Sequence, residues 1–310
     1  MEWWGILLIV LGSLLIVSFF AYCIGIAALM TNKMCHPKHY TTKEEKDSYL
    51  GELQSVDGIN EYQRIPIIFT MKDGYIIHGD YSLNNPKKFV ICMHGHTSIK
   101  DGSVKYAYAL YRLGYSLVFY DHRSHGENER DYITMGYRES QDALEIIEQV
   151  KTKFGQDIEI GLFGVSMGGQ TALLCVDRNQ SLSFVISDCA FASVKDLVRG
   201  FIKQHHSTGL ARALLPWTNL ILKMKYHFSF KDASAKDRLK NNKDVPILFI
   251  HGTKDNFVYP ENAERLYNSC NGPKRLEYFE GAAHCESIVV DKERYYKVIE
   301  EFINENRRTK

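Results

Sequence analysis

A serine stands at the centre of the segment Gly164-Val165-Ser166-Met167-Gly168, after a run of β-branched and aromatic residues and before a helical pattern. A strand, a sharp turn and a helix, with the serine at the apex, expose its Oγ as a nucleophile. The flanking glycines are needed because the backbone at such a serine is strained and crowded. The N–H groups of the following helix favour a developing anion nearby. We therefore predict that Ser166 is a nucleophile; the alternative is an ordinary surface serine in a glycine-rich turn.

A serine hydroxyl needs a base to take its proton and a third group to orient that base. In this architecture the acid follows the serine along the chain and the histidine comes last, each on a loop after a strand. Asp255 follows the predicted strand 245–250, and His284 follows the predicted strand 275–279. Either residue alone could simply cap or begin a helix. The order Ser166, Asp255, His284, at three strand ends, predicts a catalytic triad.

The tetrahedral intermediate of acyl transfer needs backbone N–H groups around its oxyanion. The residue after the nucleophile and a loop after an earlier strand usually supply them. Here these are Met167 and His96, which follows Gly95. We expect the oxyanion hole from these two backbone groups, without the His96 ring. His94 is expected to pack at its strand end, and Asp121 and Arg123 are expected to brace their loop. No role is assigned to His122 or His125.

The composition excludes several classes of function. The chain has 310 residues, 45% of them hydrophobic, and a formal net charge of +1, so nothing favours a nucleic-acid partner. Its seven cysteines fit no metal-ligand spacing and no disulfide framework. Tandem His205-His206 has no third ligand at a suitable spacing. We predict no metal and no cofactor.

Residues 5–30 contain no charged side chain and are rich in Leu, Ile, Val, Phe and Ala. As a helix this run is about 39 Å long, enough to cross a hydrocarbon core of about 30 Å with some tilt. The alternatives are a buried core helix and a cleaved signal peptide. A signal peptide would begin with positive charge and have a shorter apolar run. We predict an uncleaved anchor in the lipid bilayer.

The charges after this run predict its orientation. No Lys or Arg precedes the apolar run, whereas Lys33, Lys38, Lys43 and Lys46 follow it. Segments rich in Lys and Arg next to a transmembrane helix usually stay on the cytoplasmic side of the membrane. We therefore expect a single-pass protein of the cell membrane with its catalytic domain on the cytoplasmic side.

The rest of the chain alternates between strand and helix patterns. Besides the strands above, short apolar runs predict strands at 65–70, 75–81, 88–93, 115–120 and 182–187, and helical patterns cover 104–113 and 137–154. Such alternation predicts a mostly parallel sheet with helices on both faces. The predicted organisation is a transmembrane anchor (1–32), a juxtamembrane stalk (33–62) and one α/β domain (63–310).

One long stretch interrupts the alternation. Residues 191–243 carry helical, apolar sequence without a strand, and insertions of this length often form lids over a site. The alternative is a set of helices packed on the sheet edge. As a lid, the insertion would provide an apolar roof for the substrate, with Trp217, Phe201 and Leu214 as the expected substrate-binding residues.

Six motifs together resemble the α/β-hydrolase fold. They are His94-Gly95-His96, Asp121-His122-Arg123-Ser124-His125-Gly126, Gly164-Val165-Ser166-Met167-Gly168-Gly169, Ser187-Asp188-Cys189-Ala190, His251-Gly252-Thr253-Lys254-Asp255 and Gly281-Ala282-Ala283-His284. From about Ile65 onward the chain is similar to the prolyl-oligopeptidase-like and dienelactone-hydrolase-like branch, found as bacterial membrane-anchored hydrolases. Ser124 replaces the glycine usual at its position.

The resemblance implies a serine hydrolase acting on a small-molecule acyl substrate. We expect cleavage of a carboxylic ester or thioester, carrying an apolar acyl group, through an acyl-enzyme. A peptidase or an acyltransferase would use the same triad. A membrane-tethered binding protein on an inactive hydrolase scaffold is a third alternative, against which the intact set Ser166, Asp255 and His284 argues.

Overall fold

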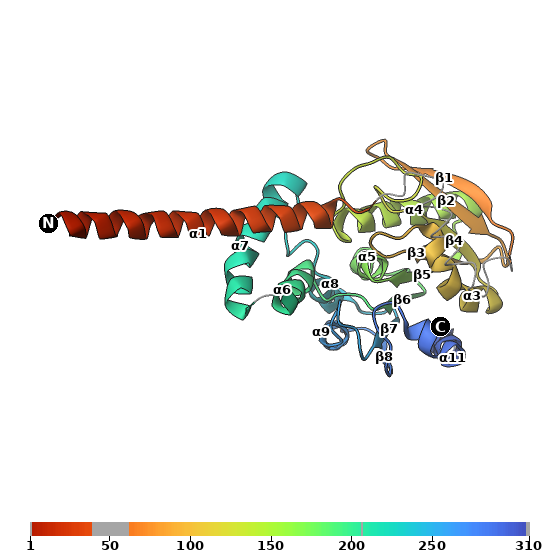
Figure 1. Cartoon of the computed structure of the whole chain (residues 1–310). Coiled ribbons are helices and arrows are strands. Elements are labelled where there is room, and N and C mark those ends of the chain that lie inside the picture. Colours follow the sequence, from red (N-terminus) through yellow and green to blue (C-terminus); the bar gives the residue numbers. More distant parts are fainter. Residues whose placement is uncertain (1, 39–61, 206, 308–310) are drawn as a thin grey trace.

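The computed structural model describes residues 2–38, 62–205 and 207–307. The first helix, α1 (Trp3–Cys35), projects from the folded domain with its N-terminal half clear of the other elements (Figure 1). By length and composition α1 is a candidate membrane span, as predicted. The helix continues to Cys35 rather than ending at residue 32. Most of the predicted stalk lies outside the described residues.

Eight strands form a single sheet in the order β1-β2-β4-β3-β5-β6-β7-β8. Strand β2 pairs antiparallel with β1 and with β4, and all the other pairs are parallel. The sheet is therefore mostly parallel, as predicted. The strands are β1 (Ile65–Thr70), β2 (Ile76–Ser82), β3 (Lys88–Met93), β4 (Ser116–Tyr120), β5 (Glu159–Val165), β6 (Phe184–Asp188), β7 (Ile247–Gly252) and β8 (Lys274–Phe279).

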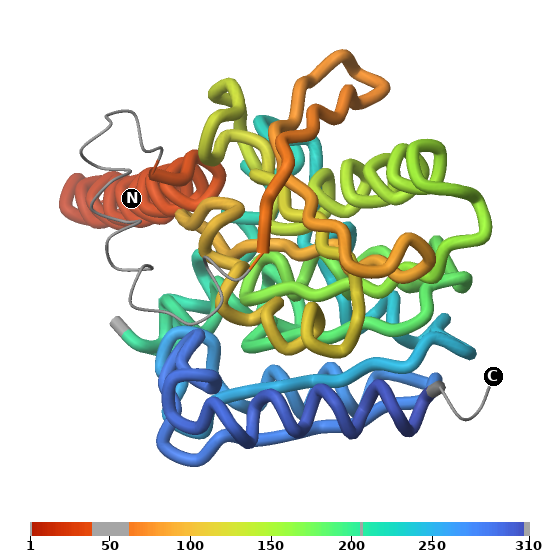
Figure 2. The backbone as a smooth tube through the Cα atoms, turned by 90° about the vertical axis from the view of Figure 1, so that its right-hand side faces the viewer, coloured from red at the N-terminus to blue at the C-terminus, as the bar shows by residue number. Residues whose placement is uncertain are grey.

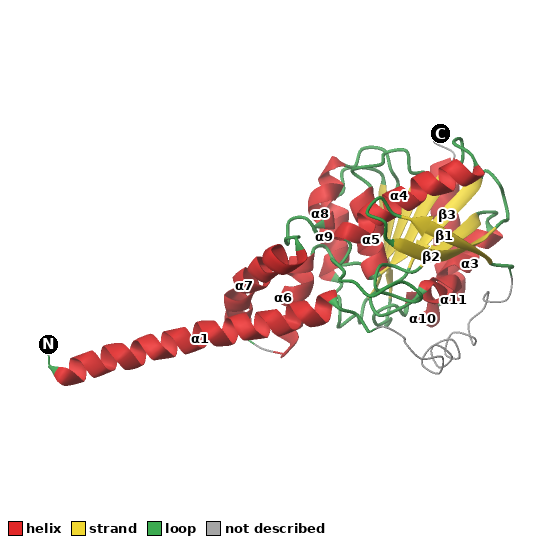
Figure 3. Cartoon of the chain, turned by 90° about the horizontal axis from the view of Figure 1, so that it is seen from above, coloured by secondary structure: helices red, strands yellow, loops and turns green. Residues whose placement is uncertain are grey.

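Helices cover both faces of this sheet (Figure 3). One face packs against α4 (Tyr137–Phe154), α5 (Met167–Cys175) and α9 (Glu261–Ser269). Helix α4 does so because Ala143, Ile146 and Val150 recur at helical spacing and are buried.

The other face packs against α3 (Val104–Arg112) and α11 (Lys292–Arg307), while η1 (Lys100–Ser103) and α10 (Ser287–Val290) are short turns in the loops leading to them. In Figure 2, viewed nearly along α1, α11 (blue) runs along the lower side of the molecule. Because parallel strands all end at the same edge, the loops after β3, β5, β7 and β8 meet there.

The insertion between β6 and β7 is helical, as predicted. It holds α6 (Val194–His205), α7 (Thr208–Tyr226), α8 (Ala235–Arg238) and η2 (Leu239–Asn241). Helices α6 and α7 form a cluster of buried apolar side chains with the C-terminal half of α1. Figures 1 and 3 show α7 beside that half of α1. The insertion therefore joins the domain to the candidate membrane span.

Candidate active site

The turn between β5 and α5 holds Ser166 in a conformation that few non-glycine residues adopt, with φ 55° and ψ −115°. A Cβ on Gly164 would collide with the Gly168 carbonyl, and one on Gly168 would collide with the Met93 carbonyl of β3. The Ser166 N–H donates to the Asp188 carbonyl of β6, at 2.8 Å. Both glycines are therefore required for the turn to lie this close to its neighbours.

The structure brings Ser166, His284 and Asp255 into one hydrogen-bonded line. The His284 Nε2 lies 2.9 Å from the Ser166 Oγ, and its Nδ1 lies 2.6 Å from the Asp255 Oδ2. Nδ1 donates to the carboxylate, which leaves Nε2 able to accept the hydroxyl proton. This is the geometry that nucleophilic catalysis by serine needs.

Asp255 is fixed from several directions. Its Oδ1 accepts the backbone N–H groups of Phe257 at 2.9 Å and Val258 at 2.7 Å, and its Oδ2 lies 3.2 Å from the His251 Nε2. Burial raises the pKa of Asp255, but the hydrogen bonds with His251 and His284 outweigh it and lower this pKa to about 2. The carboxylate thus stays ionised and orients the His284 ring.

A pair of thiols adjoins this line. Cys285 follows His284, and its Sγ lies 3.4 Å from the Sγ of Cys189, which follows β6. The hydrogen bond from Cys189 and the neighbouring His284 lower the pKa of Cys285, against burial, to about 5. Burial lowers the pKa of His284, but Asp255 and Cys285 raise it to about 10. The protonated imidazole is therefore stabilised in the free protein.

The two backbone groups expected around an oxyanion flank Ser166. His96 lines the cavity beside Ser166, and Met167 is the first residue of α5. Within the described part of the chain, neither N–H has a hydrogen-bond acceptor in the protein. The His96 ring turns away, with its Nε2 donating to the Met34 carbonyl of α1 at 3.1 Å.

His125, which had no role in the sequence analysis, supports this loop. Its Nε2 accepts the Thr97 N–H at 3.3 Å, and its Nδ1 donates to the Arg123 carbonyl at 2.7 Å. Thr97 has φ 60°, a left-handed conformation that needs such support. The sequence around His125 gives no local signal for this contact, because Thr97 belongs to another loop.

Three other polar residues of these loops, Arg123, Asp121 and His94, pack and brace, as expected. Arg123 donates to both oxygens of Asp142 of α4, at 2.6 and 2.7 Å, and both side chains are buried. Asp121 accepts the Lys100 N–H at 2.7 Å. His94 accepts the N–H of His122 at 2.9 Å. Burial, together with His94 and His125, holds the pKa of His122 well below its usual value, so its ring is neutral.

A cavity of about 510 Å³ opens beside Ser166. Its walls come from the loops after β3, β5, β7 and β8 and from the start of α3. Sequence reasoning missed several of its residues, which no motif identifies because separate elements contribute them, among them Lys105, Tyr106, Phe257 and Cys285. The Phe257 ring lies 5.0 Å from the His284 ring, between centroids, and the Tyr106 hydroxyl donates to the Cys285 carbonyl at 2.8 Å.

The three residues expected to bind substrate lie elsewhere, and this part of the prediction is corrected. Trp217 packs edge-on against Phe20 of α1, with centroids 5.9 Å apart. Leu214 is fully buried in the cluster of α6, α7 and α1, and Phe201 of α6 is 42% exposed. None of the three lines the cavity beside Ser166. The apolar side of α7 is occupied by α1, which the helical pattern alone does not reveal.

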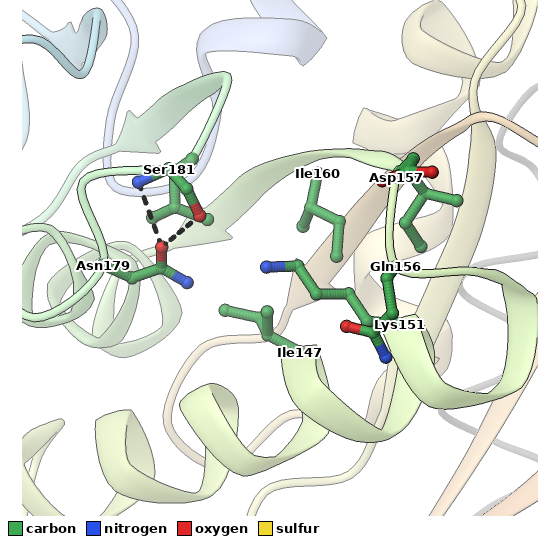
Figure 4. Close-up of a pocket in the computed structure, with 9 residues that line it drawn as sticks. Ile147, Lys151, Gln156, Asp157, Ile160, Asn179 and Ser181 are labelled. Carbon is green, nitrogen blue, oxygen red and sulfur yellow. Dashed lines mark hydrogen bonds between the residues drawn. The ribbon is translucent and has the colours of Figure 1, made fainter.

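A second cavity, of about 330 Å³, lies near the amino-terminal end of β5, away from Ser166. Figure 4 shows its lining residues. It is lined by Ile158 and Ile160 at the start of β5, by the end of α4, and by residues 179–182. The Asn179 Oδ1 accepts the Ser181 hydroxyl at 2.7 Å there. Ser166 follows the other end of β5, so this cavity takes no part in the site described above.

Solved structures share the fold at low sequence identity. An esterase of Pyrococcus furiosus, Pf2001, superposes with a TM-score of 0.66 at 20% identity, over 88% of this chain and 98% of that one. An acylaminoacyl peptidase of Pyrococcus horikoshii gives 0.59 at 18% identity, over 78% of this chain and 41% of that one. These likenesses confirm the α/β-hydrolase fold.

Sequence comparison gives the family. The chain is 28% identical over 252 residues to the Bacillus subtilis protein YqkD, described as uncharacterized, and the match covers 80% of this chain and 82% of YqkD. The family model for serine aminopeptidases, S33, matches residues 84–245, which is more than half of the chain. The protein is therefore a hydrolase of the esterase and peptidase type, and it belongs to the serine aminopeptidase S33 family of α/β-hydrolases.

Proposed function

We propose that this protein is a membrane-anchored serine hydrolase that cleaves a carboxylic ester or thioester through an acyl-enzyme on Ser166. One observation carries the proposal: the His284 ring is hydrogen bonded to the Ser166 hydroxyl on one side and to the Asp255 carboxylate on the other. A serine in this environment is a far better nucleophile than a free hydroxyl, because the base and its orienting group are already in place.

In the first step the Ser166 Oγ attacks the substrate carbonyl while His284 Nε2 accepts the hydroxyl proton. The negative charge on the carbonyl oxygen would be stabilised by the N–H groups of His96 and Met167. His284 then gives its proton to the leaving alcohol or thiol, and the acyl group stays on Ser166. A water molecule, activated by the same imidazole, releases the acid and restores the enzyme. Asp255 stays ionised and stabilises the imidazolium in both halves.

The charge of the cavity favours an ester or thioester over a free peptide. An aminopeptidase must accommodate the α-ammonium group of its substrate, which a carboxylate would bind. Among the described residues that line the cavity beside Ser166 none carries a carboxylate, and Lys105 is cationic. Its apolar side chains, Val165, Tyr106 and Phe257, suit an acyl chain. The family name keeps peptidase activity as the second candidate.

The orientation in the membrane stays a prediction. Lys33 and Lys38 follow the apolar run among the described residues, whereas Lys43 and Lys46 lie outside them. We infer a cytoplasmic catalytic domain from these charges. Protease added to intact cells should leave the domain whole, and its digestion would contradict this orientation.

Replacing the nucleophile tests the proposal. Ser166→Ala should lower kcat for a p-nitrophenyl ester by at least about 10³-fold, because the members of a triad act as a unit. His284→Ala should cost nearly as much and Asp255→Asn somewhat less. The measurement is steady-state hydrolysis by the full chain in detergent, with aminoacyl amides and added alcohol acceptors assayed in parallel. The matched control, exposed Ser181→Ala, should keep the wild-type rate. A Ser166→Ala enzyme with more than a few per cent of that rate would exclude this nucleophile.

Acyl-chain length tests the apolar cavity. Each buried methylene contributes about 0.8 kcal/mol, or about fourfold in binding. We expect kcat/KM to rise from acetyl to medium-chain esters, and Phe257→Ala to flatten that rise. Trp217→Ala should leave the profile unchanged, because Trp217 packs on Phe20 instead of lining the cavity. A flat or falling profile from acetyl to octanoyl in the wild-type enzyme would refute the acyl cavity.

The pH profile tests the pairing of His284 with Cys285. The imidazole must be neutral to accept the Ser166 proton, and its raised pKa of about 10 means that kcat/KM should climb with pH into the alkaline range. Cys285→Ala removes a negative neighbour that stabilises the imidazolium. The pKa of His284 should therefore fall, and the rising limb should move to lower pH. Cys270→Ala, a thiol buried elsewhere, should leave the limb in place. A limb that Cys285→Ala leaves unmoved would contradict the pairing.

A further inference from the structure

Two thiols and the imidazole of the proposed base form a compact group at the cavity. The Sγ atoms of Cys189 and Cys285 are 3.4 Å apart, and both cysteines are free. The two sulfurs and one ring nitrogen of His284 all lie within 4.8 Å of one another. Both cysteines have positive φ, 46° and 64°, so two separate loops adopt unusual conformations that bring the thiols together.

This geometry suits a thiophilic metal ion. Tetrahedral zinc with Zn–S bonds of about 2.3 Å separates two sulfur ligands by about 3.8 Å. The thiols therefore need to move apart by only a few tenths of an ångström. Two cysteines and one histidine also leave a fourth position for water, as in open zinc sites. Cys285 and His284 line the cavity, which gives the ion a path from solvent.

Such an ion would disable the triad. Both ring nitrogens of His284 are already used, one by Asp255 at 2.6 Å and the other by Ser166 at 2.9 Å. A metal takes a nitrogen lone pair, so it must displace one of these two partners. We propose that Cys189, Cys285 and His284 form an inhibitory binding site for a thiophilic divalent cation such as Zn²⁺. Binding releases the proton of each thiol that is not already ionised. The inhibitory part rests on the proposed function, whereas binding itself does not.

Metal binding can be measured without activity. Co²⁺ added to the full chain in detergent should give near-ultraviolet thiolate-to-cobalt absorption at one ion per chain, and Zn²⁺ should abolish it by displacement. Cys189→Ala and Cys285→Ala should each weaken binding by at least about tenfold, while Cys270→Ala should not. Unchanged absorption in the Cys189→Ala and Cys285→Ala variants would overturn the site even if the protein proves inactive as an esterase.

The inhibitory consequence has its own readout. Zn²⁺ should inhibit ester hydrolysis by the wild type and by Cys270→Ala, and a chelator should restore it. Cys189→Ala and Cys285→Ala should keep their own rates at the same Zn²⁺ concentration. Equal Zn²⁺ inhibition in these two variants would overturn the proposal. So would inhibition that a reductant reverses and a chelator does not, because that result assigns the pair to a disulfide.

An independent observation concerns the membrane. Helix α1 has two parts: residues 3–22 bury no side chain, whereas Cys23, Ala27, Thr31 and Cys35 form a buried stripe. The first part rises about 30 Å at about 1.5 Å per residue, which matches the thickness of a hydrocarbon core. The buried stripe therefore begins where a bilayer crossed by α1 would end. Phe20, at that level, contacts Trp217 of α7.

The hairpin of α6 and α7, residues 194–226, has the composition of an interfacial element. It contains six basic residues and one acidic residue, Asp196, which is buried and paired with Lys236 at 2.6 Å. Lys203 and Arg212 are exposed on the two helices. Exposed Leu220 and Met224 add apolar surface. Tryptophan, basic side chains and exposed apolar residues together favour the headgroup region of an anionic bilayer.

We propose that this hairpin docks on the anionic headgroups of the bilayer that α1 crosses, with Trp217 at the interface. Figure 1 shows the hairpin beside α1, beyond which the N-terminal half of the helix is clear of the domain. The headgroups on which the hairpin docks therefore belong to the same bilayer whose lipid surrounds residues 3–22.

Lipid quenching tests the docking. In a Trp3→Phe, Trp4→Phe background all tryptophan emission comes from Trp217, since the chain has three tryptophans. In phosphatidylglycerol vesicles brominated high on the acyl chain its emission should be strongly quenched. Lys203→Glu with Arg212→Glu should reduce quenching at least about twofold, and Lys240→Glu, outside the hairpin, should not. Two results would overturn the docking. One is Trp217 emission that the vesicles do not quench, and the other is quenching that stays unchanged in the Lys203→Glu, Arg212→Glu double variant.

Discussion

The site depends on one backbone constraint, the positive φ of Ser166 at the end of β5. A non-glycine residue held in this conformation costs about 1–3 kcal/mol, so the surrounding structure must enforce it. Here the Asp188 carbonyl of β6 accepts the Ser166 N–H, while Gly164 and Gly168 allow the turn to pack against its own carbonyls and those of β3. The strands on either side of β5 thus hold the serine in place. His284 and Asp255 reach it because β7 and β8 end at the same edge.

Sequence reasoning reached the parts of the site that follow from local pattern. The order of Ser166, Asp255 and His284 at strand ends was readable because each strand is a short apolar run and parallel strands share an edge. The substrate cavity was not readable. Lys105 and Tyr106 lie on a helix whose pattern shows only that one side is buried, and Phe257 looks like an ordinary loop residue. Their meeting place is set by the tertiary packing of α3 against the last loops.

The helical insertion shows the same limit in another way. Its apolar pattern correctly predicted helices with a buried side, but a pattern cannot name the partner that covers that side. Trp217 and Leu214 were assigned to a substrate roof, whereas the partner is α1. That packing also connects the anchor to the site. At the end of α1 the Met34 carbonyl accepts a hydrogen bond from the His96 Nε2 at 3.1 Å. The Cys35 carbonyl accepts the Ile133 N–H at 2.8 Å. The loop expected to bind the oxyanion is thereby tied to the candidate membrane span.

Nucleophilic catalysis by Ser166 is the central claim, and covalent trapping tests it most directly. The full chain in detergent would be treated with a fluorophosphonate, digested, and mapped by mass spectrometry. We predict one phosphonyl group per chain, on the peptide that carries Ser166, and none after heat denaturation. An adduct on another residue, or no adduct under conditions that label a known serine hydrolase, would contradict the account.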